Sequence, residues 1–164
     1  MKKAHIIIID DQIDVLSALL QDLKLFRERF ILDDCESADE AFELMEELDA
    51  AGEKIALVIS DHIMPNKNGI NLLSELSKDA RFENVRKILI TGQASHSDTI
   101  NAINNASIDH YVTKPWNVSE LHNVIKKMIT HWILDNDLNH QDYEGLIDTE
   151  ILFKRLKTNG GTRD

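Results

Sequence analysis

Short apolar runs alternate along the chain with longer segments in which apolar residues recur every three or four positions. The apolar runs predict strands near residues 4–9, 30–35, 55–60, 86–91 and 107–112. The longer segments predict helices near residues 12–28, 37–50, 67–79, 96–105 and 116–135. Alternation of strands with helices favours an α/β fold with a parallel sheet and right-handed crossover connections.

Three details support this pattern. The strands near 4–9 and 55–60 are unbroken apolar runs, as expected for strands that helices cover on both faces. Ser37 followed by Glu40 resembles a capping box at the start of the second helix. The first helix presents one apolar face, made by Val15, Leu16, Leu19, Leu20 and Leu23.

Polar side chains stand at the end of four of the predicted strands or just after it. Asp10 and Asp11 follow the first strand, Asp61 the third, Thr91 ends the fourth and Lys114 follows the fifth. In an open α/β sheet the reactive crevice lies outside the carboxyl ends of the strands. Three carboxylates, one hydroxyl and one ammonium at that edge predict a site that handles phosphoryl groups. Taken singly, each residue is also typical of a helix cap, a loop or a strand end.

Three carboxylates at one edge require a counter-charge. At a separation of about 4 Å, each pair would repel by roughly 4 kcal/mol at an effective dielectric constant of about 20. We therefore expect a bound cation. Mg²⁺ is favoured, because it takes hard oxygen ligands from one or two carboxylates and a phosphate, and Mn²⁺ is the alternative.

These separated elements resemble the signature of the receiver domains of two-component response regulators. The resemblance covers roughly residues 4 to 129 and implies a flavodoxin-like, doubly wound, five-stranded parallel sheet with five helices and a C-terminal helical extension. Its elements stand in the family's order, each near a strand end: Asp10-Asp11, Asp61, Met64-Pro65, Gly69, Thr91-Gly92 and Lys114-Pro115.

The resemblance implies a role for each site residue. Asp61 accepts a phosphoryl group from a histidine kinase or a phosphotransfer protein. Asp11 and Asp61 ligate the metal directly, Asp10 ligates it through water, and Ile63 ligates it by its backbone carbonyl. The metal and Lys114 neutralise the charge that develops during transfer. The protein is then a signalling phosphoacceptor that catalyses only its own phosphorylation and dephosphorylation.

The resemblance also implies a conformational switch and a pair of residues that set the lifetime of the phosphorylated form. Thr91 donates to the new phosphoryl group, and Tyr111 moves inward to fill the space that Thr91 leaves, which changes a protein-interaction surface. Ile63 and Gln93 flank the path of attacking water. Because an apolar Ile63 cannot orient water, we predict a phosphorylated lifetime that is not among the shortest.

Composition narrows the function classes. The net charge of −11 argues against direct nucleic-acid binding, which needs clustered Lys and Arg. The single cysteine, Cys35, excludes an internal disulfide and is predicted to be a small buried hydrophobe in a reducing compartment. Asp10 and Asp11 end the first apolar run too early for a signal peptide, and no segment is long enough to span a membrane. We expect a cytoplasmic protein.

The chain divides into residues 1–129, which resemble the receiver domain, and a helical extension over residues 130–164. The fifth helix is predicted to project beyond the domain, followed by a break at 136–141, a second amphipathic helix at 143–157 and a disordered tail at 159–164. The second helix either folds back on its own domain, forms a homodimer contact or docks a partner.

Other functions stay open beside the phosphoacceptor. The fold without phosphorylation would be an interaction or dimerisation module. The chain is either a stand-alone receiver that binds a downstream target or a fragment of a regulator with an enzymatic output domain. A phosphatase of the haloacid-dehalogenase type would need an Asp-x-Asp pattern, which Asp10-Asp11-Gln12 lacks. The seven histidines show no metal-ligand spacing, and His62 is predicted to face solvent or a partner.

Overall fold

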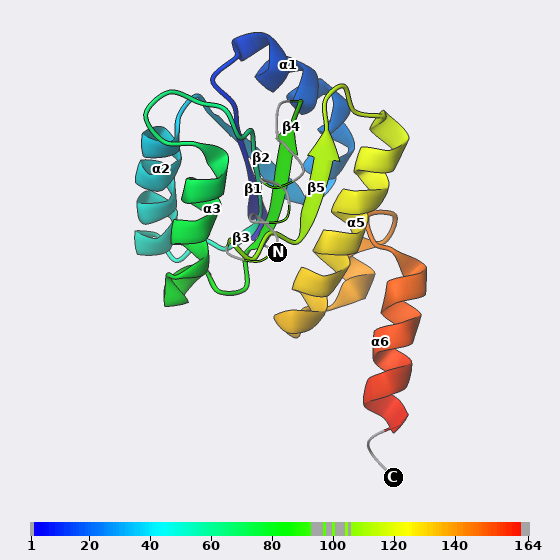
Figure 1. The fold of residues 1–164 in the computed structure, drawn as a ribbon. Helices are drawn as coiled ribbons and strands as arrows, with labels where there is room; N and C mark the ends of the chain where they lie inside the picture. The colour runs from blue at the N-terminus through cyan, green and yellow to red at the C-terminus, as the bar shows by residue number, and fades with distance from the viewer. Residues whose placement is uncertain (1, 93–96, 98–99, 101–103, 105, 162–164) are drawn as a thin grey trace.

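Five parallel strands form one sheet at the centre of the computed structural model, which describes residues 2–92, 97, 100, 104 and 106–161 (Figure 1). Their order across the sheet is β2-β1-β3-β4-β5. The strands are β1 (Ala4–Ile9), β2 (Phe30–Cys35), β3 (Ile55–Ser60), β4 (Arg86–Thr91) and β5 (His110–Thr113). This is the doubly wound, flavodoxin-like arrangement, so the predicted fold class is confirmed.

Helices cover both faces of the sheet. Figure 1 shows α2 (Ala38–Ala50) and α3 (Gly69–Ser77) on one face, with α1 (Ile13–Asp22) and α5 (Val118–Asp135) on the other. Three short 3₁₀ helices, η1 to η3, and a last helix, α6, complete the described elements: Lys24–Glu28, Ala80–Phe82, His140–Tyr143 and Thr149–Gly161. None of the helices in the described part of the chain is long and apolar enough to cross a membrane.

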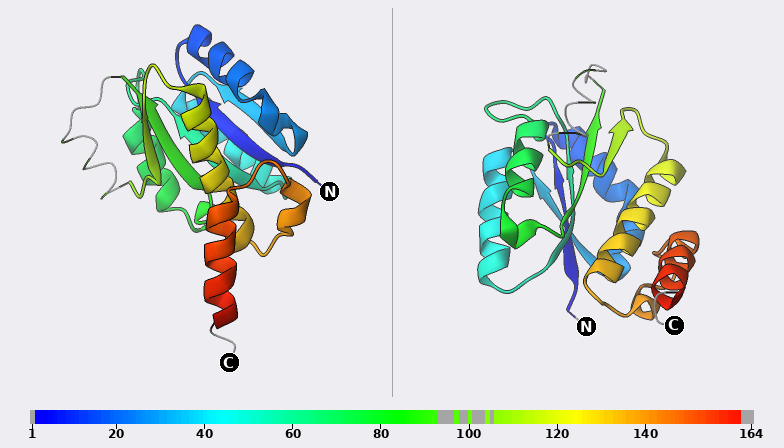
Figure 2. Two further views of the ribbon diagram at one scale, coloured as in Figure 1. Left: turned by 90° about the vertical axis from the view of Figure 1, so that its right-hand side faces the viewer. Right: turned by 60° about the horizontal axis from the view of Figure 1, so that its bottom comes forward.

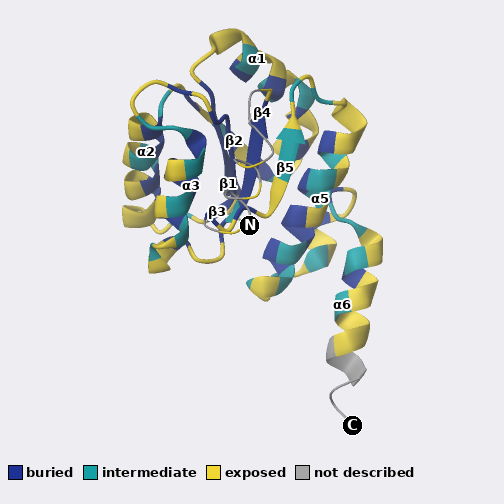
Figure 3. Ribbon diagram, viewed as in Figure 1, coloured by how far each residue is buried: buried dark blue, intermediate teal, exposed yellow. Residues whose placement is uncertain are grey.

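The interior strand β1 contributes side chains to both halves of the core. Ile6 and Ile8 belong to the cluster on the side of α1 and α5, whereas Ile7 and Ile9 belong to the cluster on the side of α2 and α3. All four are fully buried, because successive side chains of a strand point to opposite faces. The dark blue centre of Figure 3 shows this burial.

Four strands have the predicted bounds, and the fifth is shorter than predicted. β5 begins at His110 instead of residue 107. Ser107 has a positive φ of 52°, and the Asp109 carboxylate accepts the N–H of Lys87 at 2.8 Å. Residues 107–109 are therefore a turn that positions the strand. The helix predicted at 96–105 lies mostly outside the described residues.

The helix predicted at 12–28 is two elements. α1 ends at Asp22, and the tighter η1 helix follows. Leu23 and Phe26 are both fully buried, three residues apart, as the three-residue turn of a 3₁₀ helix allows. The cap predicted at the second helix is present: the Ser37 hydroxyl accepts the N–H of Glu40 at 3.1 Å. The Glu40 carboxylate accepts the N–H of Glu36, one residue earlier than a capping box requires.

The extension differs most from its prediction. The last turns of α5 do not project: Trp132 is 2% exposed, and Tyr143 from the following segment packs on the same core. The last helix begins at Thr149 instead of residue 143, because Gly145 has a φ of +87° and breaks the helical path. Residues 144–148 form a turn, and buried Leu146 anchors it.

α6 combines anchored and exposed positions. Its first turn is fixed by Asp148, whose carboxylate accepts the N–H of Ile151 at 3.0 Å and whose own N–H donates to Thr130 at 2.8 Å. Arg155 pairs with Asp135 of α5 at 2.9 Å. Beyond these contacts the helix extends away from the sheet, with a mostly exposed surface (Figures 2 and 3). α6 continues to Gly161, so it includes the first part of the segment predicted as a tail.

Candidate functional site

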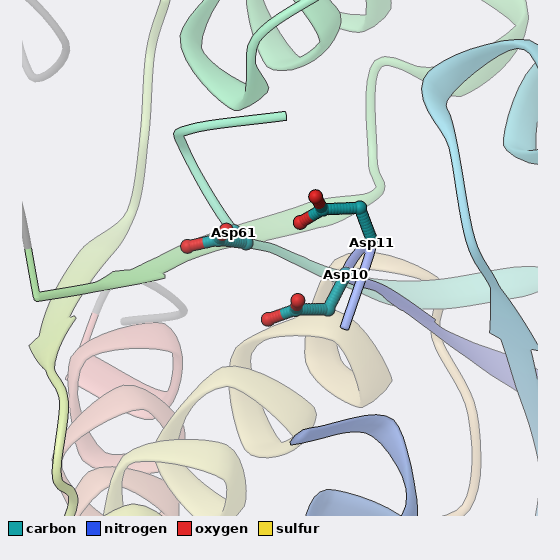
Figure 4. Close-up of side chains that lie close together, drawn as sticks. All are labelled: Asp10, Asp11 and Asp61. Carbon is teal, nitrogen blue, oxygen red and sulfur yellow. The ribbon is translucent and has the colours of Figure 1, made fainter. Parts of the chain in front are cut away.

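Three carboxylates meet at the carboxyl-end edge of the sheet. β1 and β3 are neighbours with Ile9 opposite Ser60, so the residues that follow them are adjacent. The N–H of Asp61 donates to the carbonyl of Ile9 at 2.9 Å and locks the two strand ends together. One carboxylate oxygen from each of Asp10, Asp11 and Asp61 lies within 4.8 Å of the others. Figure 4 shows the three side chains extending to the same side.

Lys114 connects two of these carboxylates. Its ammonium lies 2.8 Å from Oδ2 of Asp10 and 3.2 Å from Oδ1 of Asp61. The backbone N–H of Lys114 donates to the carbonyl of Thr91 at 3.2 Å, which holds the start of the loop after β5 beside the end of β4. The lysine therefore reaches the acidic group from the edge of the sheet.

Burial and charge act against each other at Asp61. Burial raises the pKa of Asp61, the positive charge of Lys114 lowers it, and the negative charge of Asp10 raises it again, with a net increase. Burial alone would lower the pKa of Lys114, but its contacts with Asp10 and Asp61 outweigh burial and raise it. The lysine keeps its charge, while the Asp61 carboxylate is not fully compensated.

The acidic group fits a divalent cation. Three carboxylates and one ammonium sum to a charge of −2, which one divalent cation neutralises. The three carboxylates offer hard oxygen atoms, the ligand type that Mg²⁺ prefers. Asp11 is exposed, so a cation can enter from solvent.

Gly69, at the first position of α3, fits where a larger residue cannot. A β-carbon there would lie 2.0 Å from the backbone oxygen of Asp61. The N–H of Gly69 donates to the carbonyl of His62 at 2.8 Å, which ties α3 to the loop after Asp61. Glycine is therefore needed at this position for a steric reason, because the backbones of α3 and of the loop after Asp61 are in contact.

The other predicted site residues lie around one cavity of about 380 Å³. Its walls include Asp11, Asp61, Ile63, Thr91 and Lys114. Thr91 is buried at the end of β4, and the side chain of Ile63 is 52% exposed at the rim. The structure therefore brings the acidic residues, the threonine and the lysine together.

The aromatic residue predicted for the switch is not among the residues that line that cavity. Tyr111 is half-buried on β5, opposite Leu89 of β4, and packs against the core on the side of α2 and α3. Gln93 lies outside the described residues. The roles predicted for Tyr111 and Gln93 stay predictions.

His62 is placed differently from its prediction. Its side chain is only 6% exposed, although the loop that it begins is exposed at Ile63. Its Nδ1 has no hydrogen-bond partner among the described residues. The polar character of histidine gave the wrong expectation, since tertiary packing covers the position.

Sequence reasoning missed two residues of the site. The N–H of Gln12 donates to Oδ1 of Asp10 at 2.9 Å, and Gln12 lines the cavity. The hydroxyl of Ser60 donates to the backbone oxygen of Asp61 at 2.8 Å. Both residues could have been predicted from the sequence, because Gln12 directly follows Asp11 and Ser60 directly precedes Asp61.

Comparisons with known proteins agree with this geometry. Residues 6–126 match the family model described as response regulator receiver domain. The chain is 27% identical over 154 residues to the hydrogenase transcriptional regulatory protein HoxA of Cupriavidus necator, which covers 94% of this chain and 30% of that protein. It is 29% identical over 111 residues to the chemotaxis protein CheY1 of Helicobacter pylori, covering 68% of this chain and 85% of that protein.

A solved structure is similar over most of the chain. It is the signal receiver domain of an HD domain-containing protein from Pseudomonas fluorescens Pf-5, with a TM-score of 0.73 and 26% identity. The match covers 84% of this chain and 94% of that one. By contrast, this chain spans less than a third of the HoxA protein.

Proposed function

Because the chain belongs to the response regulator receiver domain family, we propose that it is a phosphoryl-accepting switch in which Asp61 takes the phosphoryl group. The observation that carries the proposal is the cluster of Asp10, Asp11 and Asp61 within 4.8 Å, with Lys114 in contact with two of them. The donor is a histidine kinase or a phosphotransfer protein, the partner that a receiver domain implies.

The transfer exchanges one bond to phosphorus for another. A P–O bond forms at an Asp61 carboxylate oxygen while the P–N bond to the donor's imidazole breaks, and the imidazole leaves with the electron pair. Lys114 already lies 3.2 Å from Asp61 and pairs with an oxygen of the arriving phosphoryl group. A bound Mg²⁺ or Mn²⁺, held by Asp10, Asp11, Asp61 and the Ile63 carbonyl, would supply further charge neutralisation.

Thr91 and Tyr111 are the proposed readout. Thr91 ends β4 beside β3 and lines the same cavity as Asp61, which supports a role for its hydroxyl as a donor to the phosphoryl group. Tyr111 is half-buried on the neighbouring strand. Movement of this pair changes the surface at β5, which a downstream protein then recognises.

Apolar side chains at the rim support a protein partner. Ile13 is 64% exposed two residues after Asp11, and Ile63 is 52% exposed two residues after Asp61. Exposed isoleucines beside a charged pocket favour docking of a protein surface over capture of a small phosphate ester. This observation, with the family, favours the phosphoacceptor over a phosphatase of the haloacid-dehalogenase type.

The organisation of the whole protein is also a proposal. We propose residues 1–129 as the receiver unit and 130–164 as its extension. The HoxA relative is a transcriptional regulator of which the matched part is 30%, so one candidate output is a separate domain that follows a receiver. The other candidate output is a separate target protein, which would bind the same switch surface without an attached output domain.

The test is phosphorylation with acetyl phosphate, followed by intact mass and solution mass. We expect one phosphoryl group per chain, only with Mg²⁺ and not in Asp61→Asn. Beryllofluoride with Mg²⁺ then reports whether the activated form dimerises. A phosphoryl group that persists in Asp61→Asn, or incorporation without a divalent cation, would contradict the proposal. Faster decay in Ile63→Asn would support the predicted role of Ile63 in setting the lifetime.

A further inference from the structure

Two polar contacts join the end of α1 to the start of α5, the two helices that cover the same face of the sheet (Figure 1). The indole N–H of Trp116, two residues before α5, donates to Oδ2 of Asp22 at 2.9 Å. The Nε2–H of His122, in the second turn of α5, donates to the backbone carbonyl of Asp22. None of these three residues lines the cavity at Asp61, so the contacts lie outside the phosphoryl site.

Asp22 stands where a carboxylate is unfavourable for its own helix. It is the last residue of α1, and the last turn of that helix contains no basic residue. The negative end of the helix dipole lies there, so a carboxylate at this position destabilises the helix. The partly buried hydrogen bond from Trp116 offsets this effect, because hydrogen bonds to a charged acceptor are among the stronger ones. The position of Asp22 therefore favours the contact between the helices.

The segment between β5 and α5 carries Lys114, and it is anchored on both sides of Pro115. Before the proline, the backbone N–H of Lys114 donates to the carbonyl of Thr91 at 3.2 Å. Pro115 has no N–H of its own to donate. After the proline, Trp116 bonds to Asp22 and packs its ring on the core at α1 and α5. Lys114 thus lies between an anchor on β4 and an anchor on α1.

α1 connects this second anchor back to the acidic group. The helix begins directly after Gln12, whose N–H donates to Oδ1 of Asp10 at 2.9 Å. Oδ2 of the same Asp10 lies 2.8 Å from the ammonium of Lys114. The contacts form a closed ring that runs from Asp10 through Lys114 and Trp116 to α1 and returns to Asp10. Such a ring limits how far Lys114 can move from the carboxylates.

We propose that Trp116 is a positioning residue for phosphoryl transfer to Asp61. Its bond to Asp22 holds the backbone beside Lys114, so the flexible lysine side chain keeps its ammonium 3.2 Å from the acceptor carboxylate. A geometry that is held in advance lowers the entropic cost of reaching the transition state. The inference rests on the proposed phosphoacceptor function, because it concerns how fast that site reacts.

The first test compares two replacements of Asp22 in phosphorylation by acetyl phosphate with Mg²⁺. Asp22→Asn keeps an oxygen that accepts the indole N–H, whereas Asp22→Leu removes it at nearly the same size. We expect Asp22→Leu to lower the initial rate at least about fivefold and Asp22→Asn to keep most of it. Trp116→Phe removes the donor and should match Asp22→Leu. Trp132→Phe makes the same replacement near the other end of α5 and should leave the rate unchanged.

A second test asks whether the effect passes through Lys114. Lys114→Ala should itself slow phosphorylation, because the ammonium neutralises charge on the transferring group. In that background Trp116→Phe should cause no further loss, since no ammonium remains to be positioned. A merely structural role of Trp116 predicts instead that the two losses multiply. Urea unfolding of each variant confirms that the rates are measured on folded protein.

Three results would overturn the inference. They are an unchanged rate in Trp116→Phe, a loss in Asp22→Asn as large as that in Asp22→Leu, and losses that multiply in the Lys114→Ala background. Failure of the proposed function gives a different result: the natural chain takes up no phosphoryl group, or Asp61→Asn still takes one up. Either of these outcomes would overturn the proposed function and the inference together.

Discussion

The two edges of the sheet are built in different ways. At the carboxyl-end edge, Asp10 and Asp61 follow the neighbouring strands β1 and β3, and the long side chain of Lys114 reaches both of them past the end of β4. At the amino-end edge, Phe30 meets Trp132 and Tyr143, about a hundred positions later in the chain. The first edge therefore needs only the sheet, whereas the second also needs the extension to fold back.

The edges also differ in charge balance. The acidic edge keeps uncompensated negative charge, and burial raises the pKa of Asp61. At the other edge, His5 lies between Asp33 and Glu53, and its hydrogen bond is the main cause that lowers the pKa of Glu53. Negative charge therefore stays partly uncompensated at the acidic edge, whereas at the other edge the side chains of His5, Asp33 and Glu53 already pair with one another.

The largest expected effect is a loss of stability at the amino-end edge. Trp132→Ala should lower the free energy of unfolding by roughly 3–5 kcal/mol, because it empties a core position that is 2% exposed. Urea unfolding measures the loss. Phe153→Ala is the matched control: its side chain is 70% exposed, so the change should stay within about 0.5 kcal/mol. A small loss in Trp132→Ala would mean that the extension does not stabilise the domain.

Gly69→Ala should damage the acidic edge. The new methyl group would meet the Asp61 oxygen at 2.0 Å, so we expect a loss of about 1–3 kcal/mol in unfolding free energy and slower phosphorylation by acetyl phosphate. Gly92→Ala is the control, since its nearest neighbours would lie at 3.6 Å, an ordinary contact. Equal behaviour of the two variants would show that α3 can shift without cost.

The pH dependence of stability should have opposite signs at the two edges. The raised pKa of Asp61 means that the native state holds this proton more tightly, so stability falls as pH rises above the ordinary value of 3.8. The pKa of Glu53 is lowered, so its contribution is present above 4.5 and is lost as pH falls through its native pKa.

Two variants separate these contributions in urea unfolding without divalent cations, from about pH 3 to about pH 8. Asp61→Asn should be more stable than the natural chain at neutral pH and should lose the decline with rising pH. Glu53→Gln should lose part of the decline on acidification. The same pH trend in both variants would contradict the difference between the edges.

The smallest effect concerns Cys35, at the end of β2 beside Asp10. Burial, then the negative charges of Glu40, Asp33 and Asp34, raise the pKa of this thiol to about 12. At neutral pH the thiolate is almost absent, so we expect no reaction with a disulfide reagent in the folded protein and full reaction in urea. Rapid labelling of the native chain would show that the edge opens to solvent.

Sequence reasoning reached the fold class and the residues of the acidic group because both depend on short-range patterns. Apolar runs that end in Asp10, Asp61 and Thr91 mark the strands and the edge together, and four strands have the predicted bounds. The errors lie where distant segments meet. His62 is predicted to face solvent or a partner, but it is buried. The helix predicted to begin at residue 143 begins at Thr149.

The sequence by itself determined the strand and helix alternation, and with it which polar side chains meet at the carboxyl ends of β1, β3, β4 and β5. A parallel sheet brings those ends to one edge whatever the rest of the chain does. Only the tertiary structure decided that Gly69 must be glycine and that Tyr143 joins the core. These features depend on distances between segments far apart in sequence, and local hydrophobic periodicity carries no information about them.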